Sequence, residues 1–443
     1  MEFSIHPGGT ICGEARVPGD KSISHRAIML GSLAEGETRV TGFLEGEDAL
    51  ATLAAFRAMG VQIERHGEGG VTLQGVGLDG LQAPAAALDL GNSGTSIRLM
   101  SGLLAGQAFG CELTGDASLR SRPMARVITP LTQMGADIQG AEGQRPPLRI
   151  KPVSGLQGIH YDLPMASAQV KSCVLLAGLY ANGETSVTEP AVTRDHTERM
   201  LRGFGYPVQR SPEGVISLRA GGRLTATHID IPADISSAAF FMVAASIAPG
   251  SDLVLQHVGI NPTRVGIINL LQMMGADITL QDQIEVGGEP VADVHVRYAS
   301  LHGIEVPEDQ IPLAIDEFPA LFVAAACAEG RTVLRGAEEL RVKESDRIAA
   351  MAEGLTTLGA SVEVLEDGII IDGFGDKGSF GGGTLNSFDD HRIAMALSVA
   401  ALRAADKLRI RDVANVATSF PGFDALARGL GLQISVTNTS SDD

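Results

Sequence analysis

Aromatic residues are scarce in this chain, and tryptophan is absent. Phe and Tyr supply only 4% of its 443 residues. Proteins that hold single-stranded nucleic acid commonly stack the bases on aromatic rings, so this scarcity argues against that class. Positive charge is also in deficit, because 34 Lys and Arg face 53 Asp and Glu, for a net charge of −19. Such a surface repels nucleic acid and anionic membranes, so an anionic substrate must meet a local basic cluster.

Long apolar runs and clustered cysteines are missing as well. The longest apolar stretches, such as residues 238–248, are too short to span a bilayer, and residues 1–20 lack the regions of a signal peptide. The four cysteines lie far apart, with neither metal-ligand spacing nor a disulfide framework. Cys173 and Cys327 lie in apolar runs and are predicted to be buried free thiols. We therefore expect a cytoplasmic protein with no nucleic-acid or membrane partner, no metal and, without a Walker A loop, no use of ATP.

An internal repeat is the clearest organisational signal in the sequence. A helical pattern that ends at a glycine and continues into a short β-prone stretch occurs six times. Each glycine is predicted to adopt the left-handed conformation that ends a helix. The spacing between successive copies is 70 to 84 residues, and the glycines are Gly60, Gly135, Gly205, Gly275, Gly359 and Gly431.

A second type of helix alternates with the first and is apolar on nearly all sides, which predicts burial between other elements. Its copies lie within residues 24–40, 96–113, 169–189, 235–255, 318–334 and 391–410. Six units of about 70 residues favour an α/β (α+β) fold of two domains, with three units in each domain. We expect the helices to lie inside and the sheets outside. The middle of the chain, near residues 221–234, would join the domains, with a site in the cleft between them.

Small and basic residues gather where the buried helices of the first half begin. A helix N-terminus offers unpaired N–H groups and partial positive charge, which favour phosphate or carboxylate. Lys and Arg add charge-assisted hydrogen bonds. Any one of these starts is equally consistent with an ordinary helix cap, but several together indicate anion binding. The residues are Lys21, Ser22 and Arg26 in PGDKSISHR, Asn92, Ser93, Gly94 and Thr95 in DLGNSGTSIR, and Ser167, Gln169 and Lys171 in ASAQVK.

The helix starts of the second half combine carboxylates with cations. Neighbouring charges tune the pKa of a carboxylate, so such groups can serve as general acids or bases. A solvated charged face and a structural histidine are the alternatives. Metal binding is not favoured, since the acidic residues always accompany Lys or Arg. The residues are Asp316 and Glu317 in AIDEFP, Lys343, Glu344, Asp346 and Arg347 in RVKESDRI, and Asp389, Asp390, His391 and Arg392 in FDDHRIAMA.

Ten segments in order resemble the EPSP synthase (3-phosphoshikimate 1-carboxyvinyltransferase) family of enolpyruvyl transferases. They are PGDKSISHR, LGNSGTSIR, GDASLRSRPM, SAQVK, RDHTE, NPTR, IDEFP, RVKESDRI, DDHRIAMA and TSFPGF. The resemblance implies an inside-out α/β barrel fold in two similar domains, each of three βαβαββ-type units. Residues 1–18 plus 234–443 would form the domain with the acid and base, and residues 19–233 the domain with phosphate-binding helix starts. The active site would lie in the interdomain cleft.

The resemblance also implies a reaction. The enolpyruvyl group of phosphoenolpyruvate would pass to the 5-hydroxyl of shikimate 3-phosphate, releasing phosphate through a tetrahedral intermediate and without a cofactor. Asp316 would be the base and Glu344 the acid, with Lys21 and His391 assisting. The residues implied for shikimate 3-phosphate are Lys21, Ser22, Arg26, Ser167, Ala168, Gln169, Arg194, Asp316 and Lys343. Those implied for phosphoenolpyruvate are Lys21, Asn92, Gly94, Arg122, Gln169, Arg347 and Arg392.

Within the family, the segments SAQVK, RDHTE and NPTR resemble the class II branch, and two positions depart from class I. Thr418 stands where many class I members carry Lys, and Leu99 where they carry Pro. An alanine at position 94 would crowd the inhibitor glyphosate, but this chain has Gly94. We therefore expect at most intermediate tolerance of glyphosate. We also expect a monomer.

Three alternatives remain. A UDP-N-acetylglucosamine enolpyruvyl transferase would carry Cys near Ala117 and Asn at position 22, where this chain has Ser. An RNA 3′-phosphate cyclase-like protein conflicts with the acidic charge and the few aromatics. A non-catalytic binding protein would have no need of Asp316 and Glu344.

Overall fold

The structure is a computed structural model that describes residues 1–437, and its chain divides into two units. Unit 1 comprises Met1–Pro18, Pro232–Glu285 and the chain from Pro290 onward. Unit 2 comprises Gly19–Ile231 together with Val286–Glu289. Each unit has its own hydrophobic core of buried aliphatic side chains and phenylalanines.

Seven helices and three four-stranded sheets make up most of unit 2. The helices are α1 (Lys21–Leu33), α2 (Glu47–Ala58), α3 (Gly94–Ala105), α4 (Ala117–Ser121), α5 (Ala125–Gln133), α6 (Ala168–Gly178) and α7 (His196–Gly203). The sheets, in strand order, are β16 (His228–Asp230), β3 (Glu35–Thr41), β5 (Gly70–Val76) and β4 (Gln62–Gly67); β6 (Leu88–Asp89), β7 (Cys111–Thr114), β9 (Arg145–Lys151) and β8 (Asp137–Ala141); and β11 (His160–Asp162), β13 (Glu184–Thr188), β15 (Ile216–Arg219) and β14 (Gln209–Arg210). The short strands β10 (Leu156–Gln157) and β12 (Ala181–Asn182) form a separate pair.

Unit 1 repeats this composition. Its helices are α8 (Ile235–Ile247), α9 (Gly266–Met273), α10 (Ile311–Ala314), α11 (Phe318–Cys327), α12 (Arg347–Thr357), α13 (His391–Ala400) and α14 (Phe423–Leu430). Its sheets, in strand order, are β18 (Asp277–Val286), β19 (Glu289–Arg297), β17 (Asp252–Gly259) and β2 (Cys12–Ala15); β23 (Gly383–Asn386), β24 (Leu408–Arg411), β1 (Glu2–Ile5) and β25 (Ile434–Thr437); and β20 (Glu329–Leu334), β22 (Ile369–Phe374) and β21 (Ser361–Val364).

One pairing pattern recurs in the four-stranded sheets of both units. An edge strand pairs parallel with its neighbour, which in turn pairs antiparallel with a third strand, as in β16, β3 and β5. The same arrangement holds for β6, β7 and β9, and for β2, β17 and β19. In the sheet of β20, the parallel neighbour is reduced to isolated bridges from His302 and Glu305. The repeat that is visible in the sequence is therefore a repeat of sheet topology.

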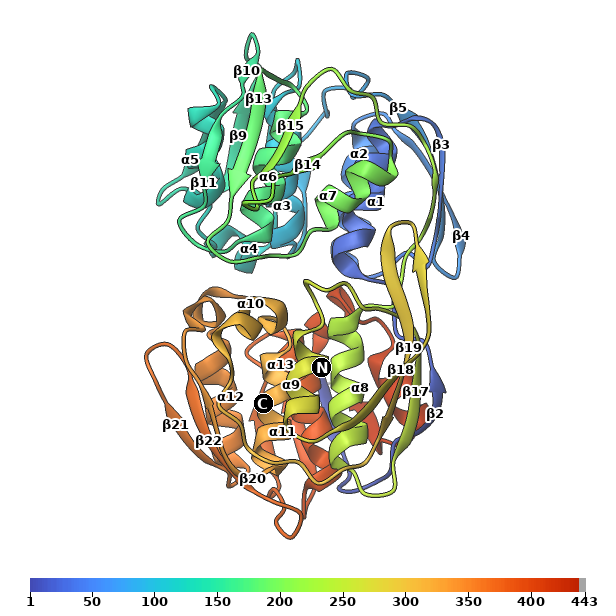
Figure 1. Cartoon of the computed structure of the whole chain (residues 1–443), viewed down its shortest axis with the longest axis vertical. Coiled ribbons are helices and arrows are strands. Elements are labelled where there is room, and N and C mark those ends of the chain that lie inside the picture. The colour runs from blue at the N-terminus through green and yellow to red at the C-terminus, as the bar shows by residue number, and fades with distance from the viewer. Residues whose placement is uncertain (438–443) are drawn as a thin grey trace. The chain divides into compact units, whose positions relative to one another are not determined.

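The predicted burial of the second helix type is confirmed. Every residue of α8 and of α11 is buried, as are eleven of the thirteen residues of α1. In unit 1, helices α8, α11 and α13 run through the middle, between the β20–β22 sheet on one side and the β17–β19 sheet on the other (Figure 1). Helices that are apolar all round need neighbours on every side, and this arrangement supplies them.

The six repeated glycines end helices in the way that the sequence predicts. All six have a positive φ, between 80° and 121°, which only glycine adopts without a steric penalty. They are Gly60, Gly135, Gly205, Gly275, Gly359 and Gly431. After each of them the backbone leaves the helix axis and turns toward the next strand.

The cysteines also follow the prediction. Cys173 and Cys327 are buried free thiols, and burial raises the pKa of Cys327 to about 12. Among residues 1–437, no helix is long and apolar enough to cross a membrane. Within the same range, no group of three His, Cys, Asp or Glu side chains is arranged to hold a metal ion.

Candidate active site

Three buried helices of unit 2 begin with side-chain caps. Asp20 accepts a hydrogen bond from the backbone N–H of Ile23 at 2.8 Å, at the start of α1. Ser93 caps α3, and Ser167 caps α6. These caps fix the first turns that carry the predicted anion-binding residues, and they leave the other N–H groups of each first turn without an intrahelical partner.

The start of α3 is joined to α1 through a buried histidine. His25 Nδ1 lies 2.8 Å from Thr52 Oγ1 and 3.2 Å from Ser96 Oγ, and its Nε2 lies 3.5 Å from Ser93 Oγ. Burial, reinforced by the charges of Lys21 and Arg26, holds the pKa of His25 well below its ordinary value. A neutral imidazole therefore links the two helix starts.

The start of α6 is joined to both other helices. Gln169 accepts a hydrogen bond from Arg98 at 2.8 Å and donates one to Thr95 at 3.1 Å. Arg26, from α1, donates to Ser172 of α6 at 2.9 Å. Unit 2 thus brings the beginnings of α1, α3 and α6 together, as a shared anion site would require.

Two guanidinium groups flank Gly94 at the first position of α3. A β-carbon built on Gly94 would lie 2.8 Å from Arg98 Nη1 and 2.9 Å from Arg122 Nη1. Arg122 also donates to Asn92 Oδ1 at 2.5 Å. Arg98 is absent from the sequence-based set, although its position one turn after Gly94 puts it on the same helix face.

The remaining predicted residues of unit 2 lie around α1. The Lys21 ammonium contacts Asp48 at 2.5 Å. Arg26 is buried and donates to the backbone oxygen of Ser22 at 2.9 Å. Burial lowers the pKa of Arg26 to about 10, with nearby Glu198 opposing and Arg194 reinforcing that change, so Arg26 stays a cation near neutral pH. The charge of Arg194 therefore acts on the Arg26 guanidinium.

Lys171 departs from the prediction. The sequence places it with Ser167 and Gln169 as a basic residue of a helix start. Its side chain is fully buried and paired with Glu189 and Glu198, at 3.0 and 2.8 Å. Because α6 is covered on this side, Lys171 faces the interior and does not present its charge to an anion.

The predicted residues of unit 1 converge on one guanidinium group. Arg347, at the start of α12, donates to Asp390 through Nε at 2.8 Å, to Glu344 through Nη2 at 2.7 Å and to Asp316 through Nη1 at 3.3 Å. Its side chain is 1% exposed. The candidate base and the candidate acid therefore contact the same cation, from segments that are 28 residues apart in sequence.

These carboxylates determine the charge state of the cluster. Burial alone would lower the pKa of Arg347, but Asp390, Glu344 and Asp316 together raise it. Burial opposes ionisation of Asp390, yet Arg347 keeps the pKa of that carboxyl below its usual value. Arg347 and Asp390 thus form a buried ion pair. To bind phosphoenolpyruvate, Arg347 would have to exchange one of its present partners.

Lys343 and Arg392 complete this group. Lys343 Nζ lies 3.5 Å from Asp316 Oδ1, and Arg392 Nη2 lies 3.9 Å from Asp316 Oδ2. Arg392 also donates to the backbone oxygen of Asp316 at 2.8 Å. Asp390 caps α13, and the buried His391 is the first residue of that helix. Asp316 thus faces three cations.

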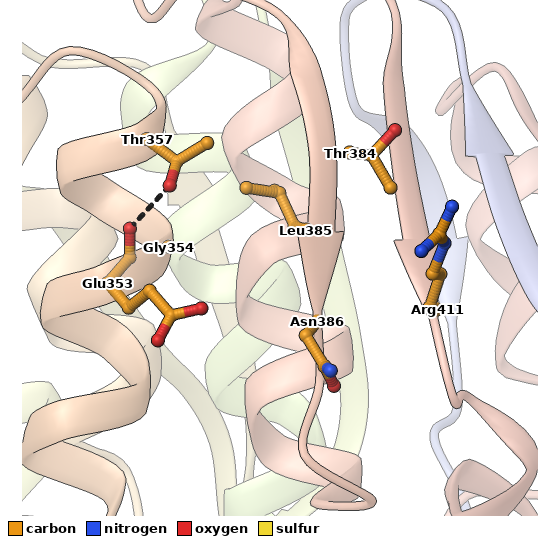
Figure 2. Close-up of a pocket in the computed structure, with 7 residues that line it drawn as sticks. All are labelled: Glu353, Gly354, Thr357, Thr384, Leu385, Asn386 and Arg411. Carbon is orange, nitrogen blue, oxygen red and sulfur yellow. Dashed lines mark hydrogen bonds between the residues drawn. The ribbon is translucent and has the colours of Figure 1, made fainter.

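A separate cavity of about 120 Å³ in unit 1 contains none of the predicted residues. It lies between α12 and the strands β23 and β24 (Figure 2). Polar side chains dominate its wall, which consists of Glu353, Gly354, Thr357, Thr384, Leu385, Asn386 and Arg411. Because Glu353, Thr357, Thr384, Asn386 and Arg411 are all exposed, it is a surface depression rather than an enclosed site.

Comparisons with known proteins identify the family to which the chain is similar. The EPSP synthase (3-phosphoshikimate 1-carboxyvinyltransferase) family model matches residues 5–426. A 3-phosphoshikimate 1-carboxyvinyltransferase of Methylococcus capsulatus is 65% identical over 435 residues, covering 98% of each chain. That of Alkalilimnicola ehrlichii is 64% identical, over 98% of this chain and 96% of its own.

Solved structures show the same fold. The EPSP synthase of Acinetobacter baumannii superimposes with a TM-score of 0.89 at 59% identity, over 99% of this chain and all of its own. The enolpyruvyl transferase NikO of Streptomyces tendae gives a TM-score of 0.79 at 18% identity, over 99% of each chain, and so shares the fold. The predicted inside-out α/β fold is thereby confirmed.

Proposed function

Because the chain belongs to the EPSP synthase family, we propose that it transfers the enolpyruvyl group of phosphoenolpyruvate to the 5-hydroxyl of shikimate 3-phosphate and releases phosphate. The same reaction serves the biosynthesis of aromatic amino acids in the family. The observation that carries the proposal is the pairing of Asp316 and Glu344 on Arg347. This reaction needs one group that accepts a proton and another that donates one, and the two carboxylates are held side by side.

The proposed chemistry assigns one carboxylate to each proton. Asp316 accepts the proton of the 5-hydroxyl, whose oxygen attacks C2 of phosphoenolpyruvate. Glu344 donates a proton to C3, which becomes a methyl group in the tetrahedral intermediate. Loss of a C3 proton and of phosphate then restores the double bond and yields the enol ether. Lys21 and His391 are proposed to stabilise charge and assist proton transfer.

Unit 2 supplies the proposed anion sites. The residues proposed to bind shikimate 3-phosphate are Ser22, Arg26, Ser167, Ala168, Gln169 and Arg194, together with Lys21, Asp316 and Lys343. The residues proposed to bind phosphoenolpyruvate are Asn92, Gly94, Arg122 and Gln169, together with Lys21, Arg347 and Arg392. The linked helix starts of α1, α3 and α6 support this assignment, since their N–H groups and guanidinium groups suit phosphate oxygens. We also propose the domain division that the resemblance implies, with residues 19–233 in one domain and residues 1–18 plus 234–443 in the other. Residues from both domains would act on the same two substrates.

Several finer properties belong to the proposal as well. We infer a cytoplasmic monomer that glyphosate inhibits. The two remaining enzyme alternatives gain no support from the site. Ala117 stands at the first position of α4 where a UDP-N-acetylglucosamine enolpyruvyl transferase would need cysteine nearby.

The proposal is tested by phosphate release. Purified protein is mixed with shikimate 3-phosphate and phosphoenolpyruvate in the presence of EDTA, and inorganic phosphate is measured over time. Release that depends on both substrates and is insensitive to EDTA is the expected result. Equal release with UDP-N-acetylglucosamine as acceptor, or none with shikimate 3-phosphate, would refute the assignment.

A further inference from the structure

Lys171 is a buried lysine that the proposed chemistry does not use. It lies in the first turns of α6, two residues after Gln169. Its ammonium contacts Glu189 and Glu198, whose side chains are each 3% exposed. A buried charge is costly unless it is paired, so this lysine holds two carboxylates from different segments against α6. Glu189 follows β13, and Glu198 lies in α7.

These contacts enclose the segment that carries Arg194. Lys171 Nζ donates to the backbone oxygen of Thr193 at 3.4 Å. The Thr193 hydroxyl donates to Glu189 Oε2 at 2.6 Å. The backbone and the side chain of residue 193 are therefore both fixed by the same ionic cluster, immediately before Arg194. We call Lys171, Glu189, Glu198 and Thr193 the ionic clamp.

The neighbouring turn of the same two helices holds Arg26. Its Nε donates to Thr197 Oγ1 at 2.7 Å, and its Nη2 donates to Ser172 Oγ at 2.9 Å. Thr197 and Ser172 are themselves hydrogen-bonded at 2.7 Å. They are also the sequence neighbours of Glu198 and Lys171. The contact between α6 and α7 therefore also holds Arg26, the other arginine proposed for shikimate 3-phosphate in this unit, through hydrogen bonds in which Lys171 takes no part.

We propose that Lys171 is a positioning residue that aims Arg194 at the 3-phosphate. This inference rests on the proposed function and specifies the phosphate, rather than the ring, as the part of the substrate that the clamp serves. Without Lys171, the two carboxylates repel each other and the Thr193 carbonyl loses a donor, so the backbone before Arg194 is released from α6. A displacement of about 1 Å at a positioned group can cost about 10²-fold.

A double-mutant cycle tests whether Lys171 acts through Arg194. The Kd of shikimate 3-phosphate is measured by titration calorimetry for the wild type, Lys171→Met, Arg194→Ala and the double variant. Each single variant is expected to weaken binding by about 10-fold or more. The double variant is expected to bind no more weakly than Arg194→Ala alone. Unphosphorylated shikimate, which lacks the phosphate, should bind the wild type and Lys171→Met equally.

Thr193→Val keeps the test decisive if Lys171→Met fails to fold. It removes only the hydroxyl that bonds Glu189 and leaves the ion pairs in place. It should weaken shikimate 3-phosphate binding in the wild type and not in Arg194→Ala. The matched control is Thr185→Val, a buried threonine of unit 2 whose hydroxyl makes no hydrogen bond, and it should leave the Kd unchanged.

The outcomes separate the two proposals. Full additivity of either cycle, or an equal loss of shikimate binding, would overturn the positioning role while leaving the proposed function intact. A wild-type chain that neither binds shikimate 3-phosphate nor releases phosphate would overturn both.

Discussion

Replacing Gly94 by alanine changes the proposed phosphoenolpyruvate site by a single added carbon atom. The added β-carbon would lie 2.8 Å from Arg98 Nη1 and 2.9 Å from Arg122 Nη1. Ordinary van der Waals contact begins at 3.4 Å, so both guanidinium groups must move away by about half an ångström. They can do so because each is the end of a flexible side chain. The φ angle of Gly94 is not positive, so an alanine can adopt the same backbone conformation without strain.

The displacement allows an estimate of the kinetic effect. A misplacement of about 1 Å at a substrate-positioning group can cost about 10²-fold, so half that distance predicts a rise of roughly 10-fold in KM for phosphoenolpyruvate. The value of kcat should change by less than about 3-fold, because neither of the residues that we propose for proton transfer is touched. The thermal midpoint should stay level or rise slightly, since alanine favours a helix over glycine by up to about 1 kcal/mol. Glyphosate should lose more affinity than phosphoenolpyruvate, because the β-carbon crowds it directly.

Steady-state kinetics with both substrates varied, together with a thermal melt, checks this prediction. Gly429→Ala is the matched control. Gly429 lies in α14, its backbone is outside the left-handed region, and its added β-carbon meets open space. It should give the same small gain in stability with unchanged KM values. An unchanged KM for phosphoenolpyruvate in Gly94→Ala would refute the placement of Arg122 at the substrate, because the steric displacement must occur in either case.

Three further outcomes follow from the buried charges. Glu344→Gln should lower kcat by about 10²-fold or more and leave both KM values within a few-fold, as measured by phosphate release. Arg347→Met should lower the free energy of unfolding by about 3–5 kcal/mol in urea, since it leaves Asp390 buried and unpaired. The pKa of His25 is lowered in the folded chain. Below about pH 6.5, His25 is therefore protonated in the unfolded chain but stays neutral in the folded chain. Stability should therefore fall with pH from about 6.5 downward, by up to about 1.4 kcal/mol per pH unit, and His25→Asn should flatten that slope.

The architecture was largely predictable because it depends on short-range rules. The glycine that ends each helix is a local steric requirement, and all six predicted positions have a positive φ. The burial of the second helix type follows from the apolar residues on all sides of each helix, as α8 and α11 show. Sheet pairing is different in kind, because β1 pairs with β24 and β25 from the other end of the chain. Nothing in residues 2–5 specifies those partners.

The fate of each cation could not be predicted, because it depends on which side of a helix meets the core. Gln169 and Lys171 are two residues apart, yet one contacts Arg98 of α3 and the other lies among buried carboxylates. The charge types around each helix start were nevertheless informative. In unit 1, Asp390 and Glu344 neutralise the charge of Arg347. Carboxylates beside a cation are the kind of group that can act as a general acid or base.

The starts in unit 2 combine amide, hydroxyl and guanidinium donors, which suit a ligand that brings its own negative charge. Asp20, which caps α1, and Asp48, which pairs with Lys21, are exceptions. An anion that binds Lys21 must compete with that carboxylate, and the competition makes the affinity of the site depend on how the buried Asp48 is held. The same competition is stronger in unit 1, where Arg347 and Arg392 contact carboxylates that an incoming phosphoenolpyruvate would have to displace.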